Sequence, residues 1–111
     1  MRAISIMFML ALLAVPLSSG PAFAEEVVQQ ASASGTRNLR PFTVKDGWEL
    51  RWTAAGPIFT AILHAQNGDP VDTIAVQTKP GPGATYYPTG GTYYLQISGA
   101  GDWSISIVQL P

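Results

Sequence analysis

Cysteine is absent from all 111 residues of the chain, and this absence excludes several kinds of chemistry. No disulfide can form, no thiol can act as a nucleophile or redox group, and no lipid can be attached through a cysteine. Small exported domains usually rely on disulfides for stability. This chain must therefore be held together by packing and hydrogen bonds alone.

Histidine is almost as scarce, because His64 is the only one. A zinc site of the usual kind takes three or four ligands from Cys, His, Asp and Glu, and one histidine without cysteine cannot meet that demand alone. A serine nucleophile needs a base beside it, and no serine lies in a Gly-x-Ser-x-Gly turn. His64 alternates away from the apolar positions of its segment, so we expect a solvent-facing residue without a catalytic role.

Paired carboxylates are lacking too. A glycoside hydrolase needs two carboxylates about 5 to 10 Å apart, yet Glu49 is the only glutamate after Glu26. We expect Glu49 to lie beside Arg51 on a solvated strand face. Asp69 and Asp72 are the one close acidic pair that could bind calcium, but an acid at position 69 is ordinary turn chemistry. The sequence predicts no catalytic residue, no cofactor and no metal site, and we do not expect an enzyme.

Basic residues are few and scattered. From position 25 onward, five basic residues against seven acidic ones leave a net charge of −2. Proteins that bind nucleic acid carry a basic face or stripe that neutralises phosphates. We therefore expect no nucleic-acid partner.

The longest apolar run lies near the N-terminus. It extends from Ile4 to Leu17 after Arg2, and small residues and the sequence Ala22-Phe23-Ala24 follow it. A positive start, a short apolar core and an A-x-A box are typical of a secretory signal peptide. The run is also shorter than the about 20 residues of a membrane span. We expect a signal-peptide helix within residues 1–24, cleavage near Ala24, and a secreted or periplasmic product without an integral membrane segment.

The 87 residues after Ala24 suffice for one domain. Apolar and polar residues alternate in several short segments between glycine, proline and asparagine turns, and no segment has a helical period. This pattern predicts an all-β fold: a small antiparallel β-sandwich of about six to eight strands over residues 41–111. The expected strands are 42–45, 48–53, 58–65, 71–77, 85–87, 92–98 and 102–108.

Three connecting segments have their own signatures. Asn67-Gly68 favours a type I′ hairpin turn. Residues 79–83, Lys-Pro-Gly-Pro-Gly, are expected to form a loop, because proline has no backbone N–H and glycine costs backbone order. Residues 25–40 are rich in small side chains, and two alternatives stay open for them: a flexible lead-in, or an edge strand that could pair between copies of the chain.

Two segments near the C-terminus carry a resemblance to a known family. Gly91–Ile97 and Gly101–Ile107 resemble the last hairpin of bacterial pre-peptidase C-terminal-type domains, which are small secreted β-sandwiches. Pro41–Val44 is similar to that family's opening strand, and Phe59–Gly68 is similar to its central strand and turn. The resemblance covers about two thirds of the residues after Ala24. It implies a non-catalytic accessory domain, here as a standalone copy, with a role in binding or solubility.

The chain departs from that family in its central strand. Acidic residues alternate along the family's strand, but the segment Phe59–Leu63 has none. A calcium site built on those acids in related domains therefore does not carry over. The pair Trp48 and Trp52 looks closer to small standalone secreted bacterial domains.

Aromatic residues carry the remaining functional signal. Tyr94 is expected to point outward, and so is Tyr86 or Tyr87, since neighbours on a strand face opposite sides. Exposed tyrosines near a Gly/Pro-rich loop can stack on sugar rings or anchor a protein partner. The alternative is cross-strand pairing that stabilises a sheet face. Aromatics that share a face with aliphatic neighbours are expected in the core: Trp48, Trp52, Phe59, Tyr93 and Trp103.

The candidate partner-binding residues are therefore Tyr86, Tyr87, Tyr94 and His64. We predict a secreted, non-enzymatic binding or interaction module of the bacterial cell envelope or exterior, whose partner is a protein or a polysaccharide. Two alternatives stay open. One is a periplasmic hydrolase inhibitor that acts through the 79–83 loop, which its prolines stiffen, and the other is a carbohydrate-binding module.

Overall fold

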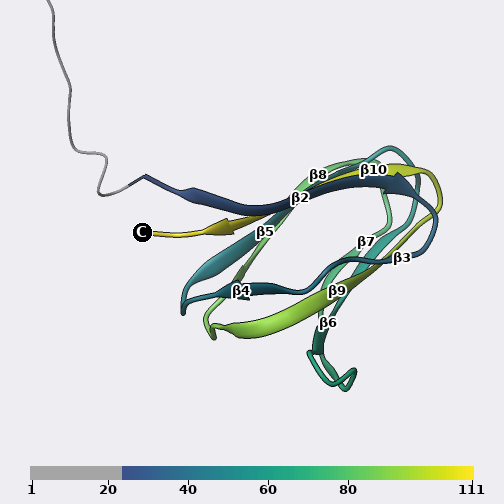
Figure 1. Cartoon of the computed structure of the whole chain (residues 1–111). Coiled ribbons are helices and arrows are strands. Elements are labelled where there is room, and N and C mark those ends of the chain that lie inside the picture. The colour runs from purple at the N-terminus through teal and green to yellow at the C-terminus, as the bar shows by residue number, and fades with distance from the viewer. Residues whose placement is uncertain (1–23) are drawn as a thin grey trace, which may run out of the picture.

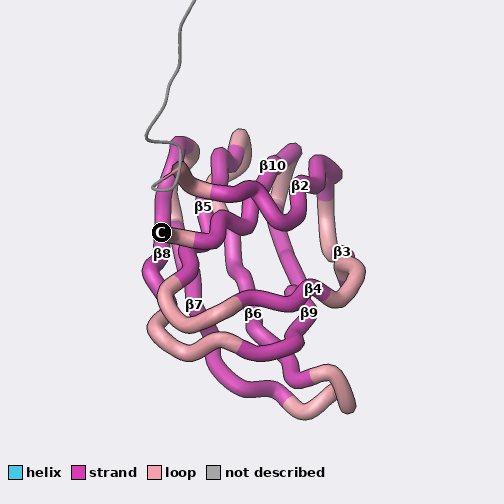
Figure 2. The backbone as a smooth tube through the Cα atoms, turned by 60° about the vertical axis from the view of Figure 1, so that its left-hand side comes forward, coloured by secondary structure: helices cyan, strands magenta, loops and turns pink. Residues whose placement is uncertain are grey.

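The computed structural model describes residues 24–111, and every regular element between them is a β-strand. Figure 1 shows the strands in two layers, one above the other, and Figure 2 shows the chain passing repeatedly between them. The predicted all-β fold is confirmed: seven of the nine strands lie within residues 41–111, where six to eight were expected, and the other two lie within residues 25–40. The expected signal-peptide helix lies outside the described residues. The strands are β2 (Glu26–Ser34), β3 (Arg37–Asn38), β4 (Phe42–Val44), β5 (Trp48–Ala54), β6 (Phe59–Ala65), β7 (Pro70–Gln77), β8 (Gly81–Tyr87), β9 (Gly91–Gly99) and β10 (Asp102–Gln109).

Both sheets are antiparallel. The first, called here the β5 sheet, has the strand order β2-β10-β5-β8. The second, the β6 sheet, has the order β3-β9-β6-β7, and β4 pairs with β9 on the same side as β3. The segment 25–40, for which a lead-in or an edge strand was open, contains β3 and the edge strand β2, which pairs with β10.

The core lies between the sheets because burial alternates along the strands. In β5 the buried residues are Trp48, Leu50, Trp52 and Ala54, and the intervening residues point away from the core. Trp52 stacks on Phe59 of the other sheet at 5.3 Å between ring centroids. Burying an aliphatic or aromatic side chain of this size stabilises the fold by about 1.5–3 kcal/mol. All five aromatics predicted for the core are buried: Trp48, Trp52, Phe59, Tyr93 and Trp103.

Each tryptophan also ties down a place where the chain crosses between sheets. The indole N–H of Trp48 donates to the carbonyl oxygen of Thr89, between β8 and β9, at 2.9 Å. That of Trp103 donates to the carbonyl oxygen of Gly35, between β2 and β3, at 3.0 Å. That of Trp52 donates to Oε1 of Gln77, at the end of β7, at 3.1 Å. A buried indole N–H needs an acceptor. Here each acceptor is an oxygen atom of a residue at, or next to, a connection between the two sheets.

The turn between β6 and β7 differs from the predicted type I′ turn. Gly68 N donates to Ala65 O at 2.9 Å, and Ala65 N donates to Asp69 O at 2.8 Å. The loop therefore has three residues, 66–68, rather than two, and Gly68 takes the positive φ of 100° that such a loop requires of its last residue. A dipeptide pattern cannot separate these two hairpins, because both favour Asn-Gly.

The predicted 79–83 loop is wrong in its second half. β8 begins at Gly81, and Pro82 and Gly83 pair with Thr53 and Trp52 of β5. Proline is tolerated because β8 is an edge strand. Glycine is required at position 83, because a Cβ there would lie 2.3 Å from the Trp52 ring. Thus the glycine that indicated a loop instead makes room for a core tryptophan.

Candidate functional site

Tyr87 does not lie on an outer face of the sandwich. It lies on the inner face of β8, half-buried and packed against the core. Its ring is 5.4 Å from that of Trp48 and meets the ring of Tyr93 edge-on at 6.2 Å. Its ring thus packs mainly within this aromatic cluster, and its assignment to the binding residues stays a prediction.

Tyr86 points the other way, as the alternation along β8 requires. It is 57% exposed on the outer face of the β5 sheet. Its register partner on β5 is Glu49, and its hydroxyl reaches the turn at Gly47. No other aromatic side chain lies beside it on this face within residues 24–111.

Tyr94 and His64 form a pair on the outer face of the β6 sheet. They are direct register partners on β9 and β6, and their rings are stacked at 4.8 Å with an interplanar angle of 4°. His64 Nδ1 is 3.1 Å from Gly68 O, and His64 Nε2 is 3.3 Å from Gln96 Oε1. The imidazole is thus half-buried and braced against the β6–β7 turn, rather than freely solvated as expected.

The four predicted residues therefore do not form one patch. Tyr87 is inside, Tyr86 is on one outer face of the sandwich, and the Tyr94–His64 pair is on the opposite outer face. Alternation along a single strand predicts whether a side chain is inside or outside. It does not say which of two outer faces a strand belongs to, and that information comes only from the pairing of strands.

The face around Tyr94 and His64 has an unusual composition. None of its outward strand positions is occupied by Asp, Glu, Lys or Arg. Hydroxyl and amide groups cover most of it, with a hydrogen bond between Thr43 Oγ1 and Thr92 Oγ1 at 2.9 Å, and Val76 at its rim is 69% exposed. We call this surface the uncharged face. It consists of Asn38, Thr43, Thr60, Ile62, His64, Thr73, Val76, Thr92, Tyr94, Gln96 and Ser98.

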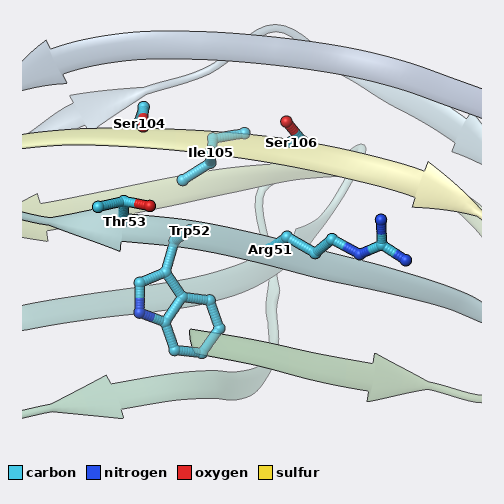
Figure 3. Close-up of a pocket in the computed structure, with 6 residues that line it drawn as sticks. All are labelled: Arg51, Trp52, Thr53, Ser104, Ile105 and Ser106. Carbon is cyan, nitrogen blue, oxygen red and sulfur yellow. The ribbon is translucent and has the colours of Figure 1, made fainter. Parts of the chain in front are cut away.

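The outer face of the β5 sheet is different. Its centre carries short side chains such as Thr53, Ser104 and Ser106, which line an open hollow together with Arg51 (Figure 3). Arg51 forms a bidentate ion pair with Glu25, at 2.6 and 3.0 Å, and its Nε donates to Glu49. The expected pairing of Glu49 with Arg51 is confirmed.

Charge on this second face is internally compensated. The hydrogen bond from Arg51 holds the pKa of the Glu25 carboxyl below its ordinary value. Hydrogen bonds to Glu25 and then to Glu49 raise the pKa of Arg51 above its ordinary value. The guanidinium is therefore committed to two carboxylates and is poorly placed to bind an anionic ligand. We call Glu25, Glu49 and Arg51 the ion triad.

The connection before β8 is short and braced. Only residues 78–80 remain outside the strands. The Gln77 side chain donates from Nε2 to Lys79 O at 2.8 Å and to Gly81 O at 3.0 Å, while its Oε1 accepts from Trp52. Sequence reasoning missed this role of Gln77. A tryptophan predicted to be buried implies an acceptor for its indole N–H, but the sequence does not indicate which polar residue provides that acceptor.

We also searched residues 24–111 for a metal site and for a membrane-spanning helix. Within residues 24–111, no three residues of the His, Asp or Glu type come together as they would around a metal ion. The Asp69 carboxylate accepts from Asn67 Nδ2 within the turn, at 3.3 Å, and the Asp69 backbone N–H donates to Asn67 Oδ1 at 3.0 Å. No helix long and apolar enough to cross a membrane occurs in the described part of the chain.

Neither a family model nor a curated protein matches this chain. The resemblance to pre-peptidase C-terminal-type domains therefore stays a prediction.

Proposed function

We propose that this protein is a secreted, non-enzymatic β-sandwich module that binds a protein of the bacterial cell envelope or exterior through its uncharged face. The observation that carries the proposal is the stacked Tyr94–His64 pair on a sheet face without Asp, Glu, Lys or Arg. The central parts of protein interfaces are depleted in charged residues and enriched in aromatic ones. The uncharged face has both properties, whereas the opposite face carries the exposed Tyr86 together with the charged ion triad.

The rigidity of the pair also supports a binding role. Ordering a side chain on binding costs about 0.5–1.5 kcal/mol when it is mobile beforehand. Here each ring nitrogen of His64 lies within 3.3 Å of an acceptor oxygen, one of which an imidazole with a single N–H can reach by donating, and Tyr94 lies flat against the imidazole. A partner would therefore meet two rings that are already positioned, on strands paired on both sides.

The test is a capture experiment with matched variants on the two faces. The protein without residues 1–24 is immobilised and used to capture proteins from bacterial envelope extract, in parallel with Tyr94→Ala, His64→Ala and Tyr86→Ala. We expect capture of a discrete protein to fall at least about tenfold for Tyr94→Ala, as for a residue at the centre of an interface. His64→Ala should weaken capture by a similar factor, and Tyr86→Ala should leave it unchanged.

Two outcomes would contradict the proposal. If Tyr86→Ala abolishes capture and Tyr94→Ala does not, the contact surface is the outer face of the β5 sheet. If neither variant changes what is captured, neither tyrosine mediates binding. Thermal unfolding of each variant separates loss of contact from loss of the fold.

A carbohydrate ligand is the second candidate, and the same face favours it. Its hydroxyl and amide side chains can exchange hydrogen bonds with an uncharged polysaccharide, and Tyr94 provides an aromatic surface. Affinity gel electrophoresis in neutral polysaccharides distinguishes this candidate from a protein partner. Retardation that is lost in Tyr94→Ala and kept in Tyr86→Ala would transfer the proposal to carbohydrate.

The hydrolase inhibitor is supported only by the braced connection at residues 78–80. Gln77 fixes the backbone on both sides of Pro80, and a loop fixed in this way loses little entropy on binding. Inhibition assays with lysozymes and secreted proteases, using Gln77→Ala and a swapped 78–80 segment, test this alternative. Unchanged enzyme activity in the presence of the protein would remove it.

Export is part of the proposal and has a direct test. Expression of the full chain in a bacterium, followed by N-terminal sequencing of the product from the periplasm and the medium, should give Glu25 as the first residue. A product that keeps Met1, or that remains in the cytoplasm, would contradict cleavage near Ala24.

A further inference from the structure

The two sheets have four edges, and three of them are poorly suited to pairing with another strand. The β8 edge contains Pro82, which has no N–H to donate. The β7 edge begins at Pro70 and has two register irregularities, between Ala61 and Ile62 and between Leu63 and His64 of its partner strand. The remaining edge of the β6 sheet is split into β3 and β4, which have two and three residues. Proline, bulges and very short strands are the usual protections of an edge.

The fourth edge, β2, is the least protected of the four. It has nine residues without proline, and no charged residue occurs from Val27 to Ser34. Its only irregularity is near Val28, opposite the step from Ile107 to Val108, so that residues 29–34 follow β10 in unbroken register. Strand β2 pairs with β10 on one side only, and it forms the rim of the β5 sheet (Figure 3). It is therefore the one long edge without proline in the described part of the chain.

Side chains along β2 are also small. Ala31, Ser32, Ala33 and Ser34 form its second half, so another backbone can approach to the usual strand spacing of about 4.8 Å. Val28, Ala31 and Ala33 face inward and are only partly buried against the core. The core thus reaches the rim here, and a strand added beside β2 would cover it.

We propose that β2 pairs antiparallel with β2 of a second copy of this chain, which joins the two β5 sheets into one continuous sheet. Gln30 is the middle residue of the strand, and a two-fold axis there places Glu26 of one copy opposite Ser34 of the other. No like charges then face each other. The strand is also already extended on β10, so pairing orders no new segment.

A foreign extended peptide fits this edge less well. Peptides that add a strand to a sheet gain their specificity from pockets that hold alternate side chains. The alanines and serines of β2 build no such pockets. A second copy needs none, because in the proposed register Ala33 of each copy lies opposite Val27 of the other and Ala31 lies opposite Gln29, so the contact is made by backbone and short side chains.

The test uses the symmetry of the proposed contact. Sedimentation velocity of the protein without residues 1–24, over a range of concentrations, should show a monomer–dimer equilibrium. In the proposed register Gln30 lies opposite itself, and its side chain is exposed, with only a 3.4 Å contact to Ser106 Oγ. Gln30→Lys should therefore abolish the dimer, because like charges directly opposite each other destabilise a strand pair. Ala84→Lys, on the edge strand at the other side of the same sheet, should not.

A charge-swap experiment makes the prediction specific to β2. Gln30→Lys and Gln30→Glu should each be monomeric alone and should form a heterodimer when mixed. The proposal is overturned if the wild-type protein is monomeric at every concentration, including the case in which it instead binds an added extended peptide. It is also overturned if a dimer forms but resists Gln30→Lys. Capture through the uncharged face is measured separately, so failure of either proposal leaves the other intact.

Discussion

The two outer faces of this sandwich are built on the same core, yet they differ in chemistry. The outer face of the β5 sheet carries short hydroxyl side chains and the ion triad, whose charges compensate one another. The uncharged face of the β6 sheet carries the stacked Tyr94–His64 pair. Charged side chains keep a surface hydrated and make it costly to bury. The comparison therefore indicates which of the two faces is more easily covered by a partner.

We expect the largest effect from a substitution in the core, which supports both outer faces. Trp48→Ala takes a fully buried ring from contacts with Phe42, Tyr87 and Tyr93, and it also removes the donor to Thr89. We expect a loss of about 3–5 kcal/mol in the free energy of unfolding, measured by urea denaturation. Amide exchange should accelerate in both sheets together. Faster exchange confined to the β5 sheet would mean that the two faces do not depend on one core.

A smaller change disturbs one side only. Gly83→Ala forces a methyl group against the Trp52 ring, and overpacking of this kind destabilises by about 1–3 kcal/mol. The matched control is Ala84→Ser, which points outward from the next position of β8 and should change the free energy of unfolding by less than about 0.5 kcal/mol. Equal stabilities for the two variants would show that Trp52 does not lie over position 83.

The next variants ask whether the Tyr94–His64 pair is structural. A cross-strand aromatic pair contributes about 0.2–1 kcal/mol, so Tyr94→Ala should destabilise by no more than about 1 kcal/mol. Tyr86→Ala should destabilise less, because its ring has no aromatic partner on its face. Calorimetry of both variants measures the difference. A loss for Tyr94→Ala as large as that for Trp48→Ala would make the pair part of the core architecture rather than a contact site.

The smallest expected effect is a pH dependence of the ion triad. The pKa of Glu25 is lowered in the folded state, so the unfolded chain binds the proton more readily. The contribution of the pair is therefore fully present above the ordinary pKa of 4.5 and is lost as the pH falls through the lowered folded value. Unfolding curves of wild type and Arg51→Met between neutral and strongly acidic pH should converge at the acidic end. A constant difference between them would contradict this account.

Much of the fold could be predicted from the sequence, because alternation is a local property. The inward positions Trp48, Leu50 and Trp52 follow from the side-chain period of two in a strand. The end of the 79–83 loop could not be predicted in this way. The prolines and glycines of this segment predict a loop. Only the position of the Trp52 ring explains why a glycine is needed within strand β8, at position 83.

The candidate site was less accessible to prediction. Outward orientation of Tyr94 follows from alternation, but its stacking on His64 depends on the register between β9 and β6, which residues far apart in the sequence determine. Separation of Tyr86 from that pair depends on which sheet β8 joins. Both are non-local facts that no motif in the chain encodes.

Photo-crosslinking tests the central claim most directly, because it asks which face a partner touches while Tyr94, His64 and Tyr86 all stay in place. A photoreactive amino acid is placed at Thr60 on the uncharged face or at Thr53 on the opposite face, and each protein is irradiated in envelope extract. The account predicts a discrete crosslinked product from Thr60 and none from Thr53. A product from Thr53 alone, or from neither position, would contradict it.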